Sequence, residues 1–375
     1  MTTRRNLGRL LAAGVIARLA AGLPAARAAS PKLASPNLTA PKLTSYTPPQ
    51  PRRHTMPHPP LIKPPRLAPG NTVGLIAPAG VISQALVDKS VARVEALGFR
   101  VRLGAHLTAV HGNYAGLWAQ RMIDFNAMFR DPDVKAIWAI RGGSGALQLL
   151  PHIDYQMVRA NPKIFVGYSD ITALHLALRR HAGLVTFHGP LAMSTPSDYA
   201  TTHLMNLLMD PQEEYVIPMS AENDRRALLA PQFTRRTVVA GVAEGRLTGG
   251  NLSLVAALAG TPYAADIRDS ILFLEDVNEE PYRIDRMLMQ LQMNQPFGQA
   301  AGVMLGVFEG CGPAPGESAL TLDETTDQHL RPLRIPAVTG YSFGHIRDQF
   351  TLPMGLRARL DTGTQTLTLL EAGVS

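Results

Sequence analysis

Residues 164–171, Ile164-Phe165-Val166-Gly167-Tyr168-Ser169-Asp170-Ile171, are the stretch from which the fold is best inferred. An apolar run ends at Gly167, presents Ser169 and continues into the helical pattern ITALHLALRR. This order predicts a buried strand that turns sharply into a helix and leaves the serine hydroxyl accessible. The elbow pattern G-x-S-x-G is only half met, because Ile171 stands where the second glycine would be. A plain helix N-cap at Ser169 or Asp170 is the alternative that the local sequence leaves open.

From residue 71 onward, short apolar runs alternate with amphipathic segments. Strand-like runs are TVGLIAP, RVRLGA and AIWAI, and helix-like segments are SQALVDKSVARVEALGF and AQRMIDFNAMF. This alternation predicts an α/β fold with a parallel sheet. Ser169 and the turn RGGSG (residues 141–145) both follow strands, so we expect them at the same edge of that sheet, where open α/β sheets bind ligands. A second α/β unit is predicted from VAEGRLTGGNLSLV and ILFLED.

Two distant segments offer the partners that a nucleophilic serine requires. The run 270–276 reads as a buried strand that ends in carboxylates, among them Glu275, and the run 341–346 places His345 directly after a glycine. A serine hydroxyl is a poor nucleophile unless an imidazole accepts its proton and a carboxylate orients that imidazole. Each residue alone is more often structural, but the three together are compatible with hydrolytic catalysis.

Seven short motifs, in one order along the chain after residue 70, resemble those of a known family. They are Gly74–Gly80 (GLIAPAG), Arg141–Gly145 (RGGSG), Gly167–Asp170 (GYSD), Gly249–Leu252 (GGNL), Phe273–Asp276 (FLED), Tyr282–Arg286 (YRIDR) and Phe343–His345 (FGH). The chain resembles the LD-carboxypeptidases of serine peptidase family S66, which also contains the microcin C7 self-immunity peptidases. The resemblance implies a parallel-sheet, flavodoxin- or amidotransferase-like N-terminal domain, a C-terminal swivelling α/β domain and an active site between them.

The resemblance also implies roles for single residues. Ser169 would be the nucleophile, His345 the general base and Glu275 the carboxylate that orients it. The residues themselves suggest the N–H groups of Asp170 and Gly143 as an oxyanion hole, since a glycine lets the backbone approach a ligand closely. Predicted substrate-binding residues are Gly142, Ser144, Arg283 and Arg347.

Two of these substrate-binding predictions have open alternatives. Ser144 stands where the family usually has an aromatic residue, which indicates an altered pocket wall. Arg283 and Arg286 are three residues apart and could instead pair with Asp285 or Glu279 at a helix start.

The substrate implied by the resemblance is a peptidoglycan stem tetrapeptide. The enzyme would release the terminal D-alanine that follows the L-centre of a diamino acid, usually meso-diaminopimelate, and a homodimer is expected. One alternative is an immunity peptidase that cleaves a peptidyl or aminoacyl adenylate. Residues 194–236 contain Tyr199, Tyr215 and Phe233 but no tryptophan to stack on a nucleobase, so the cell-wall peptide is favoured. A non-catalytic muropeptide-binding protein is the other alternative, and the presence of all three triad residues argues against it.

Several other classes of function are disfavoured by the sequence. GLIAPAG lacks the G-x-G-x-x-G spacing of a dinucleotide site, so no nicotinamide cofactor is expected. No metal site is expected, because the histidines lack zinc-site spacing and Cys311 is the sole cysteine. The net charge is +7, but residues 1–66 contain eleven Lys and Arg and no acid, which leaves 25 basic against 29 acidic side chains, or −4, in the remainder. The folded part is therefore not expected to bind nucleic acid.

The first 29 residues have the features of an export signal. Arg4-Arg5 precede a weakly apolar, alanine-rich stretch that Arg18 interrupts, and residues 26–29 (ARAA) match a signal peptidase site. This predicts export to the periplasm by the twin-arginine route, the alternative being a basic tail on a cytoplasmic enzyme. No apolar run after residue 30 is long enough to span a bilayer, so no integral membrane segment is expected in the mature protein.

The predicted organisation therefore has five segments. They are a signal peptide (1–29), a proline-rich linker (30–69), an N-terminal domain with the nucleophile (70–200), an interdomain connection (201–236) and a C-terminal domain with Glu275 and His345 (237–375).

Overall fold

A computed structural model of the chain describes residues 59–314, 316 and 318–375. The predicted export signal and residues 30–58 of the predicted linker lie outside the described residues, so both stay predictions. The unit that begins at residue 56 is described by itself below. In its described part, no helix is long and apolar enough to cross a membrane.

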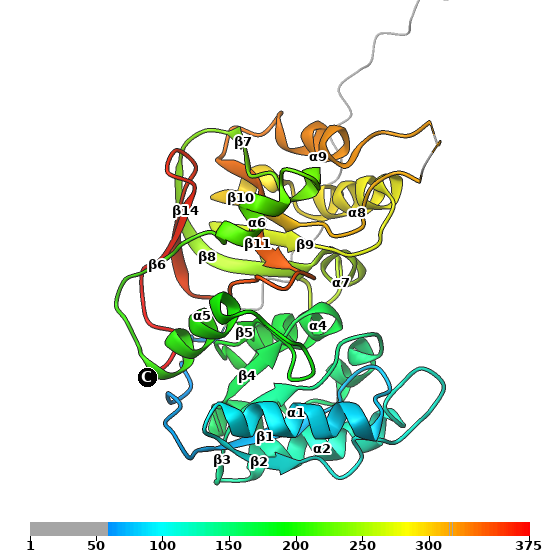
Figure 1. The fold of residues 1–375 in the computed structure, drawn as a ribbon, viewed down its shortest axis with the longest axis vertical. Helices are drawn as coiled ribbons and strands as arrows, with labels where there is room; N and C mark the ends of the chain where they lie inside the picture. The colour runs from blue at the N-terminus through cyan, green and yellow to red at the C-terminus, as the bar shows by residue number, and fades with distance from the viewer. Residues whose placement is uncertain (1–58, 315, 317) are drawn as a thin grey trace, which may run out of the picture. The chain divides into compact units, whose positions relative to one another are not determined.

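The first sheet has six strands in the order β12-β5-β4-β3-β1-β2, and it occupies the lower half of the unit in Figure 1. Strands β1 to β5 run parallel, and β12 pairs antiparallel with β5 at one edge. The sheet is buried because its central strands are almost continuously apolar, as a parallel sheet covered by helices requires. The bounds are β1 Thr72–Ile76, β2 Arg100–Leu103, β3 Val134–Ala139, β4 Ile164–Gly167, β5 Phe187–His188 and β12 Leu352–Pro353.

The second sheet has eight strands in the order β6-β14-β13-β8-β9-β10-β11-β7, and it forms the upper half of the unit. Its centre, β8 to β11, is parallel, and the strands on either side pair antiparallel. The bounds are β6 Tyr215–Ile217, β7 Arg236–Val239, β8 Val242–Asn251, β9 Ser270–Glu275, β10 Gly302–Val307, β11 Ala337–Gly344, β13 Arg357–Asp361 and β14 Thr366–Leu369.

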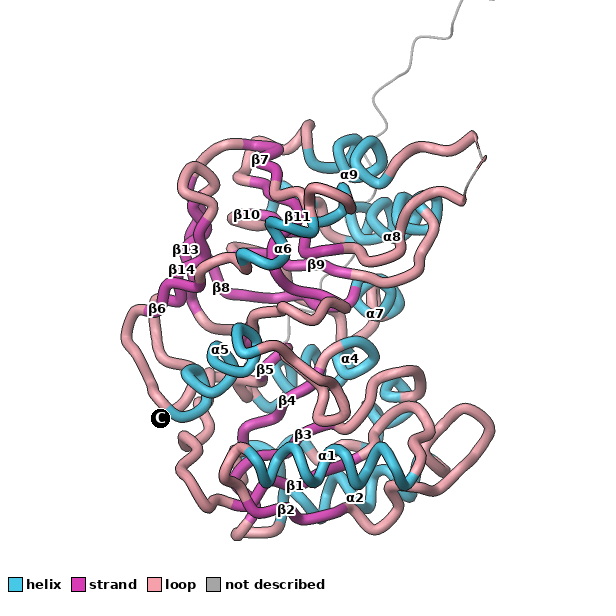
Figure 2. The backbone as a smooth tube through the Cα atoms, viewed as in Figure 1, coloured by secondary structure: helices cyan, strands magenta, loops and turns pink. Residues whose placement is uncertain are grey.

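Helices pack on both sheets, and Figure 2 shows α1 crossing in front of β1 and β2. The predicted α/β class is confirmed by this arrangement, and each sheet has a parallel centre with antiparallel strands at one edge or both. Helix α1 begins after Ser83, whose hydroxyl accepts a hydrogen bond from the Leu86 N–H. This bond satisfies one of the free N–H donors of the first turn. The bounds are α1 Gln84–Ala96, α2 Trp118–Arg130, α3 Tyr155–Ala160, α4 Thr172–Ala177, α5 Asp198–Met209, α6 Ala221–Arg226, α7 Leu252–Ala257, α8 Pro281–Asn294 and α9 Leu322–Leu330.

The chain passes between the two sheets more than once. Strand β12 comes from the C-terminal part of the sequence and completes the first sheet beside His188. The segment 201–236, which the sequence predicts as a connection, includes most of α5 and also β6, which joins the second sheet. One hydrophobic core cluster contains buried residues from both halves. The two sheets are therefore joined by the crossings of the chain between them and by a continuous core.

Helix α4 contacts the end of β8 directly. The Asn251 N–H donates to Thr172 Oγ1 over 3.0 Å, and Gly250 packs so closely that a Cβ there would lie 2.6 Å from Thr172 Oγ1. Thr172 is the first residue of α4, and Asn251 is the last residue of β8. This contact brings the carboxyl end of the second sheet against the helix that follows Ser169.

Candidate active site

Ser169 lies on a strained turn between β4 and α4. Its φ is +65°, in the left-handed region that residues with a side chain rarely adopt. A short 3₁₀ turn, Ser169–Ile171, joins the strand to the helix. Gly167 permits the sharp bend, because a Cβ there would lie 2.9 Å from Ile171 Cγ2. Such strain, on the order of 1–3 kcal/mol, persists where the surroundings enforce it, which is typical of a nucleophile elbow.

Gly142 lies directly against the Ser169 side chain. A Cβ at Gly142 would be 2.8 Å from Ser169 Cβ and 3.0 Å from its Oγ. The predicted substrate-binding glycine and the predicted nucleophile are thus neighbours.

We expect Gly142→Ala to lower kcat/KM by about 10²-fold, because the added methyl group would displace the hydroxyl from its position. Gly298→Ala is a matched control, since no atom lies within 4 Å of a Cβ there. Steady-state kinetics of both variants test this. Equal activity of Gly142→Ala and the control would contradict the close packing of Ser169 on residue 142.

Glu275 and His345 form a buried acid–base pair. His345 Nδ1 donates to Glu275 Oε2 over 2.7 Å, and Glu275 is fully buried at the end of β9. His345 follows Gly344, whose φ is +123°, and a Cβ on Gly344 would approach Glu275 Oε2 to 3.3 Å. The glycine therefore leaves room for the carboxylate. Because Nδ1 donates to Glu275, Nε2 is left as the proton acceptor of a neutral imidazole.

The neighbouring carboxylate, Asp276, has a different role. Its Oδ1 accepts a hydrogen bond from Asn251 Nδ2 over 2.9 Å, and its Oδ2 accepts from the N–H and hydroxyl of Ser253. Asp276 thus holds the start of α7, where a negative charge is favourable. Of the two carboxylates that the sequence places at this strand end, Glu275 is the one that pairs with the histidine.

The pKa of His345 lies above its usual range. Burial acts to lower this pKa, but the Glu275 charge and its hydrogen bond outweigh burial, and Asp276 adds to their effect. A histidine with a raised pKa is a stronger base once neutral. It loses this function as the pH falls through that pKa.

Tyr168 connects the nucleophile turn with the histidine. Its ring lies edge-on against the His345 ring, with centroids 4.8 Å apart, and Tyr168 directly precedes Ser169. A second link between the two parts of the site comes from the strand register. Glu275 on β9 lies opposite Asn251 on β8, and the Asn251 N–H donates a hydrogen bond to Thr172. Within the described chain no hydrogen bond joins Ser169 Oγ to His345. That third contact belongs to the proposal below.

The two predicted oxyanion donors lie beside the nucleophile. Gly143 has φ +104°, and a Cβ there would lie 3.2 Å from Gly80 Cα, so only glycine fits between the two loops. The Gly80 N–H donates to the Gly142 carbonyl over 3.0 Å, which joins the GLIAPAG and RGGSG turns. Asp170 follows Ser169 at the start of the short helical turn.

The predicted substrate-binding side chains divide into two groups. Arg283 projects from α8 into an ion-pair cluster with Glu280 at 3.5 Å and Glu279 at 3.8 Å, as the alternative interpretation holds. Arg286 lies over the ring of Tyr282 on the same helix. Arg347, in contrast, is exposed two residues after His345.

Ser144, one of the predicted substrate-binding residues, is hydrogen-bonded at the site. Asn113 Nδ2 donates to Ser144 Oγ over 2.6 Å. A polar pair from two loops therefore stands next to the Gly142–Gly143 turn. The sequence singled out Ser144 but not Asn113, because a loop asparagine carries no pattern that marks it.

Other contributors to the site also have weak sequence signals. Tyr168 is part of the GYSD motif, but nothing in the sequence indicates its contact with His345. Arg121 is buried under the RGGSG turn although it lies in an ordinary amphipathic helix pattern. Among residues 59–314, 316 and 318–375, no group of three or more His, Cys, Asp or Glu side chains is arranged to hold a metal ion.

The fold and this site define a two-domain hydrolase with a serine at a strand-to-helix turn. Family models agree, because the LD-carboxypeptidase N-terminal domain matches residues 73–189 and the C-terminal domain matches residues 244–360. The chain belongs to the LD-carboxypeptidase family and is a serine-type carboxypeptidase.

Similar proteins include both cell-wall and immunity peptidases. A probable murein peptide carboxypeptidase of Bacillus subtilis is 38% identical over 320 residues, covering 84% of this chain and 95% of that protein. The microcin C7 self-immunity protein MccF of Escherichia coli is 28% identical over 342 residues, covering 85% of this chain and 98% of that protein. The solved muramoyltetrapeptide carboxypeptidase of Oxalobacter formigenes is similar with a TM-score of 0.68 and 28% identity, covering 80% of this chain and 98% of that one.

Proposed function

We propose that this enzyme releases the terminal D-alanine from peptidoglycan tetrapeptide stems, at the L,D bond after meso-diaminopimelate, through a triad of Ser169, His345 and Glu275. The observation that carries the proposal is the 2.7 Å bond between His345 Nδ1 and buried Glu275 Oε2, adjacent to the turn that bears Ser169. The similarity to a murein peptide carboxypeptidase supports this substrate class.

In the proposed mechanism, Ser169 Oγ attacks the carbonyl carbon of the scissile bond and its proton passes to His345 Nε2. Glu275 stabilises the resulting imidazolium. The N–H groups of Gly143 and Asp170 bind the oxyanion of the tetrahedral intermediate. His345 then gives the proton to the nitrogen of D-alanine, which leaves, and Ser169 is left acylated. A water molecule, deprotonated by His345, hydrolyses the ester and restores the serine.

The competing substrate class is a peptidyl or aminoacyl adenylate, which the similarity to MccF supports. The Asn113–Ser144 pair stands at the place where an aromatic would form the pocket wall, and it favours polar peptide groups over a stacked ring. We therefore place the cell-wall peptide first. The predicted homodimer and the predicted periplasmic location stay predictions.

One experiment separates the two substrate classes. The full chain is assayed with a diaminopimelate-containing tetrapeptide and with the diastereomer that ends in L-alanine. A hydrolysis-stable analogue of an aminoacyl adenylate, with a sulfamate in place of the phosphate, is added as a competitor. We expect release of D-alanine, little release of L-alanine and weak inhibition by the analogue. No D-alanine release together with tight binding of the analogue, measured by calorimetry, would assign the enzyme to the adenylate class.

A further inference from the structure

One peptide group beside the nucleophile is held at both ends by buried charged side chains. Arg121 Nη1 donates to the Gly145 carbonyl over 2.9 Å, and the Ala146 N–H donates to Asp170 Oδ2 over 2.8 Å. The Gly145 carbonyl and the Ala146 N–H belong to the same peptide bond. A cation thus faces its oxygen and an anion faces its hydrogen, which is the favourable orientation of the peptide dipole.

Both charged side chains are almost completely buried. Arg121 is 2% exposed and Asp170 is 4% exposed. They attract each other electrostatically, yet in the described part of the chain they form no direct ion pair and interact through the peptide group between them. An amide side chain could make either hydrogen bond without the cost of burying a charge. The use of two charges indicates that the orientation of this peptide group matters.

Arg121 also joins the turn to a second loop of the site. Its guanidinium donates to the Pro78 carbonyl over 2.9 Å and to Gln148 Oε1 over 2.6 Å. Pro78 belongs to the GLIAPAG loop, whose Gly80 N–H in turn holds the Gly142 carbonyl. The RGGSG turn is therefore held before and after Gly143, and Gly145 at its end has φ +118°.

We propose that the side chains of Asp170 and Arg121 are a positioning pair for the oxyanion hole, which fixes the RGGSG turn so that the Gly143 N–H converges with the Asp170 N–H on one oxygen. Asp170 then acts twice, with its backbone as one donor and its carboxylate as the tether of the loop that bears the other donor. Because Ser169 directly precedes Asp170, the same contacts also fix the position of the nucleophile relative to the two donors. This inference rests on the proposed function, and it concerns two side chains that act through the Gly143 loop and do not themselves touch the reacting atoms.

The ionisation of Asp170 supplies a signature of this role. Burial raises its pKa to about 6, although the Ala146 N–H and Arg121 favour the charged form. Arg121 is the charged group that faces Asp170, and the Tyr114 ring in turn covers Arg121. As the pH falls through about 6, protonation of Asp170 weakens its hold on Ala146. The pKa of His345 is also raised, so His345 becomes protonated at a higher pH than Asp170 does. The acid limb of the rate profile therefore contains two ionisations.

Three variants of the full chain test the positioning role. We expect Asp170→Ala to lower kcat for D-alanine release by about 10²-fold with KM changed less than about threefold, since the effect resembles loss of one oxyanion donor. Asp170→Asn keeps an acceptor for Ala146 but lacks the charge, as protonated Asp170 does, so it should recover little of kcat. Below pH 6, the slope of log kcat/KM against pH should fall from about 2 in the wild type to about 1 in Asp170→Asn, because one ionisation is removed.

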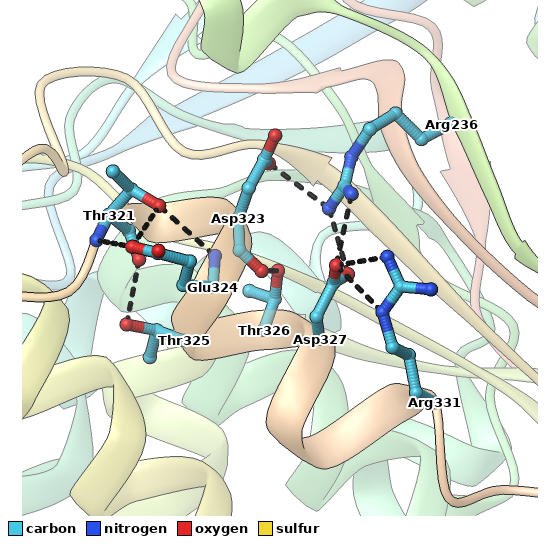
Figure 3. Close-up of polar contacts among 8 residues, drawn as sticks. All are labelled: Arg236, Thr321, Asp323, Glu324, Thr325, Thr326, Asp327 and Arg331. Carbon is cyan, nitrogen blue, oxygen red and sulfur yellow. Dashed lines mark hydrogen bonds and ion pairs between the residues drawn. The ribbon is translucent and has the colours of Figure 1, made fainter.

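Asp327→Ala is the matched control. Asp327 is also a largely buried carboxylate, 15% exposed, and it accepts hydrogen bonds from Arg236 and Arg331 (Figure 3). It lies on α9, at the end of the unit opposite β1 and β2 (Figure 1). This variant should lose stability and keep the wild-type kcat and limiting slope. Equal losses of kcat in Asp170→Ala and Asp327→Ala, or a slope unchanged in Asp170→Asn, would overturn the positioning role.

Two further readouts separate this inference from the proposed function. Hydrolysis of p-nitrophenyl acetate depends on an oxyanion hole whatever the natural substrate is, and amide hydrogen exchange at Ala146 and Gly143 reports on the loop without any substrate. Absence of D-alanine release, with ester hydrolysis lost in Asp170→Ala and faster exchange at Ala146, would refute the proposed substrate and retain the positioning pair. Unchanged exchange at both amides in Asp170→Ala would refute the pair.

Discussion

Replacing Glu275 by glutamine is expected to lower kcat for D-alanine release by about 10³–10⁴-fold. Glutamine is nearly isosteric, so the packing under Gly344 is kept, but its amide can donate to Nδ1 and so favour the tautomer with the proton on Nε2. That tautomer cannot accept the serine proton. The measurement is steady-state kinetics at a pH well above the pKa of His345, where the wild-type imidazole is neutral.

The same variant should change the pH profile in a defined direction. Glu275 is what holds the pKa of His345 above its usual range, while burial acts to lower it. Without the carboxylate charge, burial dominates and the pKa of His345 falls. The acid limb of the residual activity is therefore expected to move to lower pH. An acid limb that stays in place or moves upward would contradict the assignment of Glu275 as the partner of His345.

The pair also contributes to stability in a limited pH range. Because the folded-state pKa of His345 is raised, its ion pair with Glu275 stabilises the fold fully below the unfolded pKa of histidine, and this contribution is lost as the pH rises through the folded value. Denaturant unfolding of wild type and Glu275→Gln should consequently differ more at acidic than at alkaline pH. The opposite trend would indicate that Glu275 does not raise the pKa of His345 in the folded protein.

Replacing Ser169 by alanine or glycine is expected to reduce kcat by about 10⁴–10⁶-fold, since no hydroxyl remains to attack the carbonyl. The two variants should differ in stability. Alanine retains the strain at φ +65°, whereas glycine adopts this conformation freely, so Ser169→Gly should be about 1 kcal/mol more stable than Ser169→Ala.

Urea unfolding of the two Ser169 variants measures that difference, and thermal unfolding checks it. Equal stability would mean that the turn relaxes when the hydroxyl is removed, contrary to a conformation enforced by Gly142 and Gly167. Activity retained in either variant would remove Ser169 from the nucleophile role altogether.

Much of the fold follows from local patterns. The strands around Gly74, Trp138 and Val166 are apolar because they are covered on both faces, and that pattern can be recognised without tertiary information. The same holds for the positions of Ser169 and Gly143, since residues that follow parallel strands gather at one sheet edge.

Other features depend on contacts that no local pattern encodes. Strand β12 has two residues and pairs beside His188, more than 160 positions earlier in the chain, so sequence alone does not assign it. Arg121 appears as a helix-surface cation in the sequence, but it is buried by the loops that it joins. Arg283 was a substrate-binding prediction, and the structure engages it with Glu279 and Glu280 at the start of α8.

The most direct test of the account is D-alanine release from a diaminopimelate-containing muropeptide tetrapeptide by the purified full chain beside Ser169→Ala. We expect release of one D-alanine per tetrapeptide by the wild type, with a tripeptide as the other product, and a loss of about 10⁴-fold or more in the variant. Equal release by the two proteins would place the nucleophile elsewhere. No release by a folded wild type would contradict the proposed substrate.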